Sequence, residues 1–240
     1  MTVTDVNVVK SAIFERPDDA NKGTLGSLLC VCGSYGMAGA AVMSAKGALR
    51  TGIGLAKCAL PRSIYPIVAQ TILESVYYPL SENADGRISK VNVPFLVSES
   101  SKSSATLVGC GLGVCDDTLK IVFSLIENST TPLVLDADAL NCVAKQPEIL
   151  LRKKAPIIIT PHPGEMSRLT GLATPLVNAE RERVALDFTQ KYGVVTVLKG
   201  AGTVIASPNG KVLVNPTGNS GMATGGSGDV LAGMTASILA

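Results

Sequence analysis

The chain has 240 residues, of which 46% are apolar and 17% are charged, and 21 Lys and Arg against 19 Asp and Glu give it a net charge of +2. This composition is typical of a globular chain with a large core and excludes a disordered one. So small a positive charge argues against a nucleic-acid or membrane-surface partner, because both require a concentrated basic surface.

The N-terminal residues 1–14 have polar side chains, Asp5, Asn7 and Lys10, where a signal peptide has its apolar segment. No apolar run in the chain reaches the roughly 18–20 residues that a membrane helix needs. The six cysteines form no C-x-x-C pair and the only histidine is His162, so we assign no metal ligand. We expect a cytoplasmic protein with reduced, structural thiols.

Short apolar runs alternate with longer helical stretches along the chain. The runs expected to form buried strands are 27–32, 55–60, 105–108, 133–135, 157–160 and 194–198. The helices expected between them are 39–50, 118–128, 139–144 and 179–192. Near-continuous apolar strands are typical of a parallel sheet with helices on both faces, so the pattern predicts a doubly wound α/β fold.

Towards the C-terminus the pattern changes to strands joined by short turns. Strands are expected at 203–207 and 212–215, and the Ser-Pro-Asn-Gly sequence between them is typical of a β-hairpin. An antiparallel edge on the parallel sheet follows. The segments 83–86 and 98–104 are expected to be polar loops too short to separate domains, so we expect one domain over residues 1–240.

A glycine-rich stretch, 215–231, precedes an apolar helical run at 230–239. Its five glycines are Gly218, Gly221, Gly225, Gly226 and Gly228. Glycines let backbone N–H groups converge, and the N-terminus of the following helix adds a partial positive charge, which together favour a phosphate. Asp229 could accept a proton from a nucleophilic hydroxyl at this site. The alternative is a flexible loop in which Asp229 is the helix N-cap.

A second glycine-containing turn lies between two expected strands. Its residues are Lys199, Gly200, Ala201, Gly202 and Thr203. Two glycines around a tight turn expose N–H groups that can bind a phosphate, and the side chains of Lys199 and Thr203 can add donors. The alternative is an ordinary hairpin turn.

The segment 33–41 is a third glycine-rich turn between an expected strand and an expected helix. Its spacing is not G-x-G-x-x-G, and no acidic residue follows about 20 residues later, so a conventional dinucleotide site is not expected. We expect a loop that a ligand approaches closely.

Polar clusters follow three expected strands, at 109–113, 136–141 and 160–165. Ligands of open α/β sheets bind beyond the carboxyl ends of the strands. His162 lies between two prolines that stiffen its loop, so we expect it to contact a ligand. Asp138 could instead cap the next helix, and Glu165 could lie in a first helical turn.

In chain order these motifs resemble those of the NAD(P)H-hydrate dehydratases, which are ribokinase-like enzymes, over residues 22–240. The matching motifs are K-G-T-L-G-S-L-L-C-V-C-G-S-Y-G-M-A-G-A-A (22–41), G-C-G-L-G (109–113), V-L-D-A-D-A-L-N (134–141), I-T-P-H-P-G-E (159–165), V-L-K-G-A-G-T (197–203) and N-P-T-G-N-S-G-M-A-T-G-G-S-G-D-V-L-A-G (215–233). The resemblance implies a ribokinase-like three-layer α/β sandwich, a mostly parallel central sheet with an antiparallel edge and no lid.

The resemblance also implies a reaction. ADP or ATP, with Mg²⁺, would phosphorylate the ring hydroxyl of hydrated NADH or NADPH, and elimination of phosphate would restore the dinucleotide. It further implies a homotetramer and the following assignments. Nucleotide-binding residues would be Lys199, Gly200, Ala201, Gly202, Thr203 and Gly228, and substrate-binding residues would be Ala40, Gly113, His162 and Asp229. Asp229 would be the catalytic base, and Gly225, Gly226, Ser227 and Gly228 would form the anion hole.

The sequence departs from the family pattern in three places. Ser220 stands where proline is expected, Ser227 stands where threonine is common, and the family's further C-terminal helices beside the nucleotide pocket would follow Ala240. Two other functions are compatible with the motifs. One is a kinase of a small hydroxylated metabolite such as a sugar, a thiazole alcohol or a B6 vitamer, and the other is an inactive nucleotide-binding module.

Overall fold

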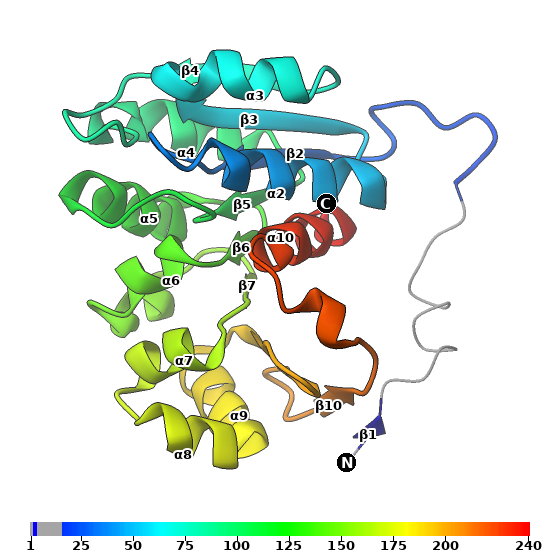
Figure 1. The fold of residues 1–240 in the computed structure, drawn as a ribbon, viewed down its shortest axis with the longest axis vertical. Coiled ribbons are helices and arrows are strands. Elements are labelled where there is room, and N and C mark those ends of the chain that lie inside the picture. Colours follow the sequence, from blue (N-terminus) through cyan, green and yellow to red (C-terminus); the bar gives the residue numbers. More distant parts are fainter. Residues whose placement is uncertain (1, 4–15) are drawn as a thin grey trace.

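The computed structural model describes residues 2–3 and 16–240, and one ten-stranded sheet runs through it (Figure 1). In sheet order the strands are β1 (Thr2–Val3), β10 (Val212–Asn215), β9 (Thr203–Ala206), β8 (Val195–Leu198), β7 (Ile157–Ile159), β6 (Leu133–Leu135), β5 (Ala105–Val108), β2 (Ser27–Val31), β3 (Leu55–Pro61) and β4 (Val76–Leu80). Strand β9 runs antiparallel to both of its neighbours, β8 and β10, and the other adjacent strands of the described sheet pair parallel. The predicted mostly parallel sheet with an antiparallel edge is confirmed. Apart from Thr2 and Val3, the N-terminal stretch 1–14 lies outside the described residues.

Helices cover both faces of the sheet. One face packs against α2 (Ala38–Thr51), α3 (Tyr65–Thr71) and α10 (Ser227–Leu239). The other packs against α4 (Val93–Ser101), α5 (Asp116–Asn128), α6 (Asp138–Val143), α7 (Pro163–Thr170), α8 (Thr174–Ala179) and α9 (Arg181–Tyr192). Short 3₁₀ turns are η1 (Arg62–Ile64), η2 (Lys90–Asn92), η3 (Pro147–Arg152) and η4 (Ser220–Met222). Strands such as β5 are buried along their whole length, which explains their continuous apolar sequences.

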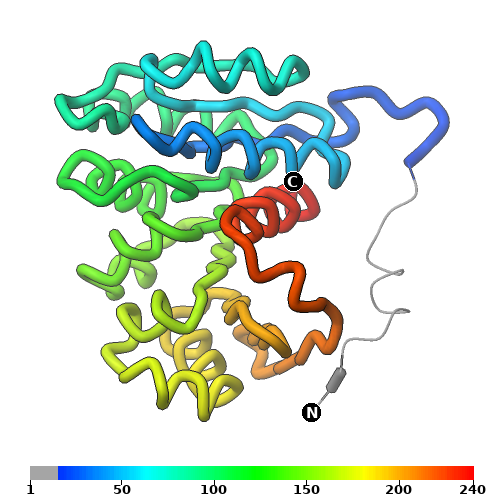
Figure 2. Tube along the Cα trace, in the orientation of Figure 1, coloured from blue at the N-terminus to red at the C-terminus, as the bar shows by residue number. Residues whose placement is uncertain are grey.

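Small residues let α10 lie directly against α2, although the two helices are far apart in the sequence (Figure 2). A Cβ added at Gly233 of α10 would lie 2.0 Å from the Ser44 carbonyl oxygen, and one added at Gly47 of α2 would lie 2.7 Å from the Val230 carbonyl oxygen. The two backbones are therefore in contact at both glycines. This contact fixes the start of α10 over the middle of the sheet.

The helix expected at 179–192 is confirmed as α9, which begins two residues later, at Arg181, because Glu180 leaves the helical conformation (φ −126°, ψ 40°). One expectation about local structure is wrong. The segment 98–104 is not all loop, since α4 continues to Ser101. Ser100 is buried there, and its hydroxyl hydrogen-bonds with the hydroxyls of Thr106 (2.9 Å) and Ser129 (2.8 Å). Tertiary partners thus offset the weak helix propensity of serine.

All six cysteines are free thiols, as expected, and five of them are buried. Within the described part of the chain, no helix is both long and apolar enough to cross a membrane.

Candidate active site

The loops after β5, β6, β7 and β8 meet at one edge of the sheet. Gly109 follows β5 with a φ of 128°, and a Cβ there would lie 1.9 Å from the Asp136 carbonyl oxygen after β6. Lys199 donates its backbone N–H to the Pro161 carbonyl after β7 (2.8 Å). The polar clusters predicted at separate strand ends therefore form one continuous surface.

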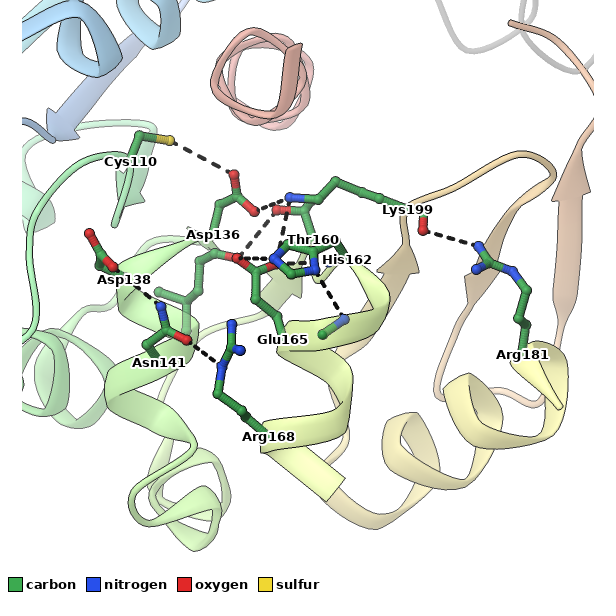
Figure 3. Close-up of polar contacts among 12 residues, drawn as sticks. Cys110, Asp136, Asp138, Asn141, Thr160, His162, Glu165, Arg168, Arg181 and Lys199 are labelled. Atoms are coloured by element: carbon green, nitrogen blue, oxygen red, sulfur yellow. Dashed lines mark hydrogen bonds and ion pairs between the residues drawn. The ribbon is translucent and has the colours of Figure 1, made fainter. Parts of the chain in front are cut away.

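Lys199 is the first residue of the 199–203 turn, and its side chain extends toward Asp136 (Figure 3). Its ammonium donates to Asp136 Oδ1 at 2.6 Å and lies 3.8 Å from Glu165 Oε2. A Cβ added at Gly228, in the first turn of α10, would lie 3.5 Å from the same Lys199 Nζ. One cation thus connects β8, two buried carboxylates and the N-terminus of α10.

Asp229 lies in the first turn of α10 and is partly buried. The helix N-cap is Gly226, which has a φ of 90°, so the alternative that Asp229 caps the helix is wrong. Burial raises the pKa of Asp229, a hydrogen bond from Cys110 opposes the rise, and the charge of Asp136 adds to it. A carboxylate held this way accepts a proton more readily than an ordinary aspartate.

The segment 225–228 forms the turn into α10. Gly226 requires its positive φ, and a Cβ there would lie 2.1 Å from the Met43 sulfur. A Cβ at Gly225 would meet nothing within 4 Å, so its backbone is open to a ligand. Ser227 is the first helical residue. First-turn N–H groups have no partner within their own helix, so this turn presents donors and a partial positive charge next to Lys199.

Arg181 supports the start of the 199–203 turn through hydrogen bonds to backbone carbonyls. Its Nη2 donates to the carbonyl of Leu198 (2.8 Å) and to that of Lys199 (3.1 Å). Burial lowers the pKa of this guanidinium, and its Nε is buried without a hydrogen-bond partner. A Cβ at Gly200, where φ is 151°, would lie 2.9 Å from Arg181 Nη2. The backbone of the turn therefore rests directly on the guanidinium.

A cavity of about 410 Å³ opens beside this turn. Ala201 and Gly202 line one side, and the α8–α9 junction, residues 178–183, lines the other. Val204 and Val214 provide an apolar wall. The cavity gives the predicted phosphate turn an adjoining space for the rest of a nucleotide.

His162 is the N-cap of α7, and its side chain is 51% exposed. Its Nδ1 accepts the Gly164 N–H (3.0 Å), while Glu165 Oε2 accepts the His162 backbone N–H (2.7 Å). Glu165 lies in the first turn of α7, as expected, and burial raises its pKa although the charge of Lys199 opposes the rise. The imidazole remains accessible at the edge of the site.

Gly113 and Ala40 lie on adjoining loops. Gly113 has a φ of 75°, and its N–H donates to Asp138 Oδ2 at 2.8 Å. The N-cap of α6 is Ala137, so the alternative that Asp138 caps this helix is wrong. Ala40 is buried, and a Cβ added at Gly111 would lie 2.7 Å from its methyl group. The 33–41 loop therefore packs against the 109–113 loop.

Five polar residues near this edge had no assigned role in the sequence analysis: Cys110, Asp136, Asn141, Arg168 and Arg181. The Cys110 thiol donates to Asp136 Oδ2 at 3.9 Å, and Arg168 Nε donates to Asn141 Oδ1 at 2.8 Å. Cys110 and Asn141 fall within motifs at strand ends, which is a signal of proximity to a site. The two arginines lie in ordinary polar helices, where no local pattern distinguishes them.

A family model described as NAD(P)H-hydrate dehydratase matches residues 28–240. The chain belongs to this family. It is 35% identical over 228 residues to an ADP-dependent (S)-NAD(P)H-hydrate dehydratase of Neisseria meningitidis, covering 94% of this chain and 73% of the relative. A crystal structure of the ADP/ATP-dependent dehydratase of Bacillus subtilis, co-crystallised with ATP/Mg²⁺, superposes with a TM-score of 0.83 at 31% identity, covering 99% of this chain and 80% of that one. The predicted ribokinase-like fold is confirmed.

Other members of the NAD(P)H-hydrate dehydratase family are longer. The chain is 41% identical over 223 residues to a bifunctional NAD(P)H-hydrate repair enzyme of Thermofilum pendens. The alignment covers 93% of this chain but 43% of that relative. The chain thus spans less than half the length of its bifunctional relatives.

Proposed function

We propose that this chain is an ADP- or ATP-dependent dehydratase that converts hydrated NADH and NADPH back to NADH and NADPH, a hydro-lyase of dinucleotide repair. Family membership and the names of its relatives support this function. The observation that carries the proposal is the convergence of two glycine-rich turns on Lys199 and Asp229. Phosphoryl transfer requires this combination of backbone donors, a cation and a base in one place.

In this proposal the adenine nucleotide lies along the 199–203 turn and the start of α10. Its binding residues are Lys199, Gly200, Ala201, Gly202, Thr203 and Gly228, and the anion hole consists of Gly225, Gly226, Ser227 and Gly228. The adjoining cavity of about 410 Å³ and the positive φ of Gly200 and Gly202 support this assignment. The exposed N–H groups of the first turn of α10 stabilise the charge of the transferring phosphoryl group.

The hydrated dinucleotide contacts Ala40, Gly113, His162 and Asp229 in this proposal. The packing of the 33–41 and 109–113 loops and the exposed imidazole of His162 support the assignment. Ala40 is the most buried of these four residues and packs against the loop at Gly111.

We derive the chemistry from these positions. The ring hydroxyl attacks the terminal phosphoryl group of ADP or ATP, and Asp229 accepts the hydroxyl proton as the new O–P bond forms. The bond from that phosphorus to the bridging oxygen breaks, and AMP or ADP leaves with its electrons. The phosphate then leaves with the electrons of its C–O bond while the neighbouring ring carbon loses a proton, which restores the double bond. Lys199 balances the negative charge that accumulates next to α10.

We propose that Mg²⁺ enters this site together with the nucleotide. In the described part of the chain, no group of three or more His, Cys, Asp or Glu side chains is arranged to hold a metal ion alone. Mg²⁺ is commonly held by one or two carboxylates together with substrate phosphates and water, so Asp136 fits this requirement and leaves Asp229 free to act as the base. When bound, the ion neutralises phosphate charge.

We also propose that the protein is a cytoplasmic homotetramer. The free thiols support a reducing location. Exposed apolar side chains next to the edge strand β4, including Leu73 (83%) and Val91 (69%), support assembly through this end of the sheet. Light scattering on the purified protein measures the mass directly, and a monomer at micromolar concentration would contradict the proposal.

The activity is tested with chemically hydrated NADPH, Mg²⁺ and either ADP or ATP. We expect the absorbance of reduced nicotinamide to recover only when a nucleotide is present, with one phosphate released per dinucleotide repaired. A stable phosphate ester that accumulates without regenerated NADPH would instead identify a small-molecule kinase. Nucleotide binding without any turnover would identify an inactive module.

A further inference from the structure

Three consecutive hydrogen bonds connect the Gly113 loop to helix α7. Figure 3 shows the two that join Asp138, Asn141 and Arg168. The Gly113 N–H donates to Asp138 Oδ2 at 2.8 Å, and the Asn141 amide nitrogen donates to Asp138 Oδ1 at 3.2 Å. Arg168 Nε then donates to Asn141 Oδ1 at 2.8 Å. We call Asp138, Asn141 and Arg168 the α6–α7 chain.

The α6–α7 chain joins two loops that follow different strands. Asp138 and Asn141 are three residues apart on α6, which places their side chains on one face of that helix. Arg168 lies on α7, and the N-cap of α7 is His162. The chain therefore connects the backbone of Gly113 to the helix that begins at His162.

Gly113 depends on this connection for its backbone position. Its φ of 75° excludes most side chains, and a Cβ there would lie 2.4 Å from Arg87 Nε. Next to the buried side chain of Leu112, Gly113 itself is held by its backbone hydrogen bond to Asp138. Displacement of Asp138 would move the Gly113 N–H directly.

Asn141 is the central member because it uses both ends of its amide. Its nitrogen is the donor that orients the Asp138 carboxylate, and its oxygen is the acceptor that holds Arg168. A carboxylate at this position would retain the second bond but would face Asp138 with a like charge. An apolar side chain of similar size would remove both bonds.

We propose that Asn141 is a positioning residue for the dinucleotide, which fixes the Gly113 loop relative to His162 without touching the ligand itself. The inference rests on the proposed function, in which Gly113 and His162 contact the hydrated dinucleotide from opposite ends of the α6–α7 chain. The nucleotide turn at 199–203 has its own support from Arg181, so ATP affinity should depend much less on Asn141 than dinucleotide affinity does.

The test compares Asn141→Leu with wild type in KM for hydrated NADPH, kcat, Kd for ATP and melting temperature. Loss of two hydrogen bonds on the dinucleotide side should raise KM about three- to tenfold and leave kcat and the ATP Kd within about twofold. Arg168→Gln removes only the outer bond and should raise KM less. The double variant should match Asn141→Leu, because both changes interrupt the same chain.

Asn128→Leu is the matched control. The Asn128 amide donates only to the Ser124 carbonyl of its own helix, α5, so this variant should retain wild-type KM. An unchanged KM in Asn141→Leu would overturn the inference. Equal losses in KM and in ATP affinity, with a lower melting temperature, would also overturn it, because they indicate a general structural role.

Calorimetry with NADPH distinguishes failure of the inference from failure of the proposed function. If wild type binds NADPH but does not repair the hydrate, the proposed reaction is wrong. A higher Kd for NADPH in Asn141→Leu than in wild type would still support the positioning role of Asn141. An unchanged Kd for NADPH in that variant would contradict the positioning role. Wild-type protein that neither repairs the hydrate nor binds NADPH overturns both.

Discussion

At the scale of single residues, the surroundings of Asp229 determine its acid–base chemistry. It lies between the turn 225–228 and the ion pair of Lys199 with Asp136, and burial raises its pKa. A general base of this kind is lost by protonation at a higher pH than a solvent-exposed aspartate.

Asp229→Asn should retain the fold and nucleotide binding but lose turnover by about 10²–10⁴-fold, because the amide cannot accept the hydroxyl proton. In wild type, kcat/KM should fall as pH decreases through the raised pKa of Asp229. Steady-state rates as a function of pH, with ATP calorimetry on the same preparations, check both statements. Turnover within a few-fold of wild type would remove Asp229 from the mechanism.

Gly200→Val tests the nucleotide turn. A side chain at this position would lie against the Arg181 guanidinium and would block the close approach of a phosphate, so ATP affinity should fall at least tenfold. Gly210→Val is the control, because Gly210 also has a positive φ (86°, against 151° at Gly200), lies in the β9–β10 hairpin and has no neighbour closer than 3.9 Å to an added Cβ. Loss of ATP affinity in both variants would point to general strain and not to a phosphate site.

At the scale of secondary-structure elements, the contact of α10 with α2 determines where the anion-binding turn lies. Both helices have glycine where their backbones meet, and neither glycine is required by its φ. The reason for glycine at these positions is therefore the short distance between the helices.

Gly233→Ala should destabilise the protein by about 1–3 kcal/mol, because its Cβ would lie 2.0 Å from the Ser44 carbonyl oxygen and would separate α10 from α2. Gly39→Ala is the control within α2, since its Cβ would meet nothing within 4 Å and alanine favours helices. Urea unfolding measures both free energies. We expect Gly233→Ala also to weaken ATP binding, as the start of α10 moves, and an unchanged free energy of unfolding would contradict the prediction.

At the scale of the whole molecule, a buried ion pair stabilises the half of the sheet opposite the nucleotide turn. Lys57 of β3 donates to Glu99 Oε1 of α4 at 2.8 Å, and Tyr78 of β4 donates to the same carboxylate at 3.1 Å. Burial alone would raise the pKa of Glu99, but the hydrogen bond and charge of Lys57 outweigh burial and lower it. The pair therefore couples stability to pH.

Because the pKa of Glu99 is lower in the folded chain than in the unfolded chain, its contribution is complete above the unfolded value of 4.5 and is lost as pH falls through the folded value. We expect the free energy of unfolding to fall below pH 4.5 by more in wild type than in Glu99→Gln. Asp229 and Glu165 have raised pKa values and act in the opposite direction, so the difference between the two proteins isolates Glu99. Parallel curves from urea unfolding would exclude this coupling.

Much of this molecule could be predicted from local patterns. The strands 105–108 and 133–135 lie where continuous apolar runs predicted them, because strands buried on both faces require such runs. The half-buried strand 212–215 was predicted from the hairpin turn before it. The edge strand β4 has no such run, since Val76 and Pro79 are exposed, and it was not predicted. Helices that depend on tertiary partners, such as the serine-rich end of α4, were also missed.

The sequence by itself determined the fold class and the candidate site motifs, since apolar periodicity, glycine turns and polar strand ends are local features of the chain. Only the tertiary structure decided which charged groups meet. Lys199 and Asp136 are 63 residues apart, and Arg168 and Asn141 are 27 apart. Such pairs depend on how the loops at the strand ends are arranged in the folded chain. The residues next to a lysine or arginine in the sequence do not indicate which carboxylate or amide it will contact.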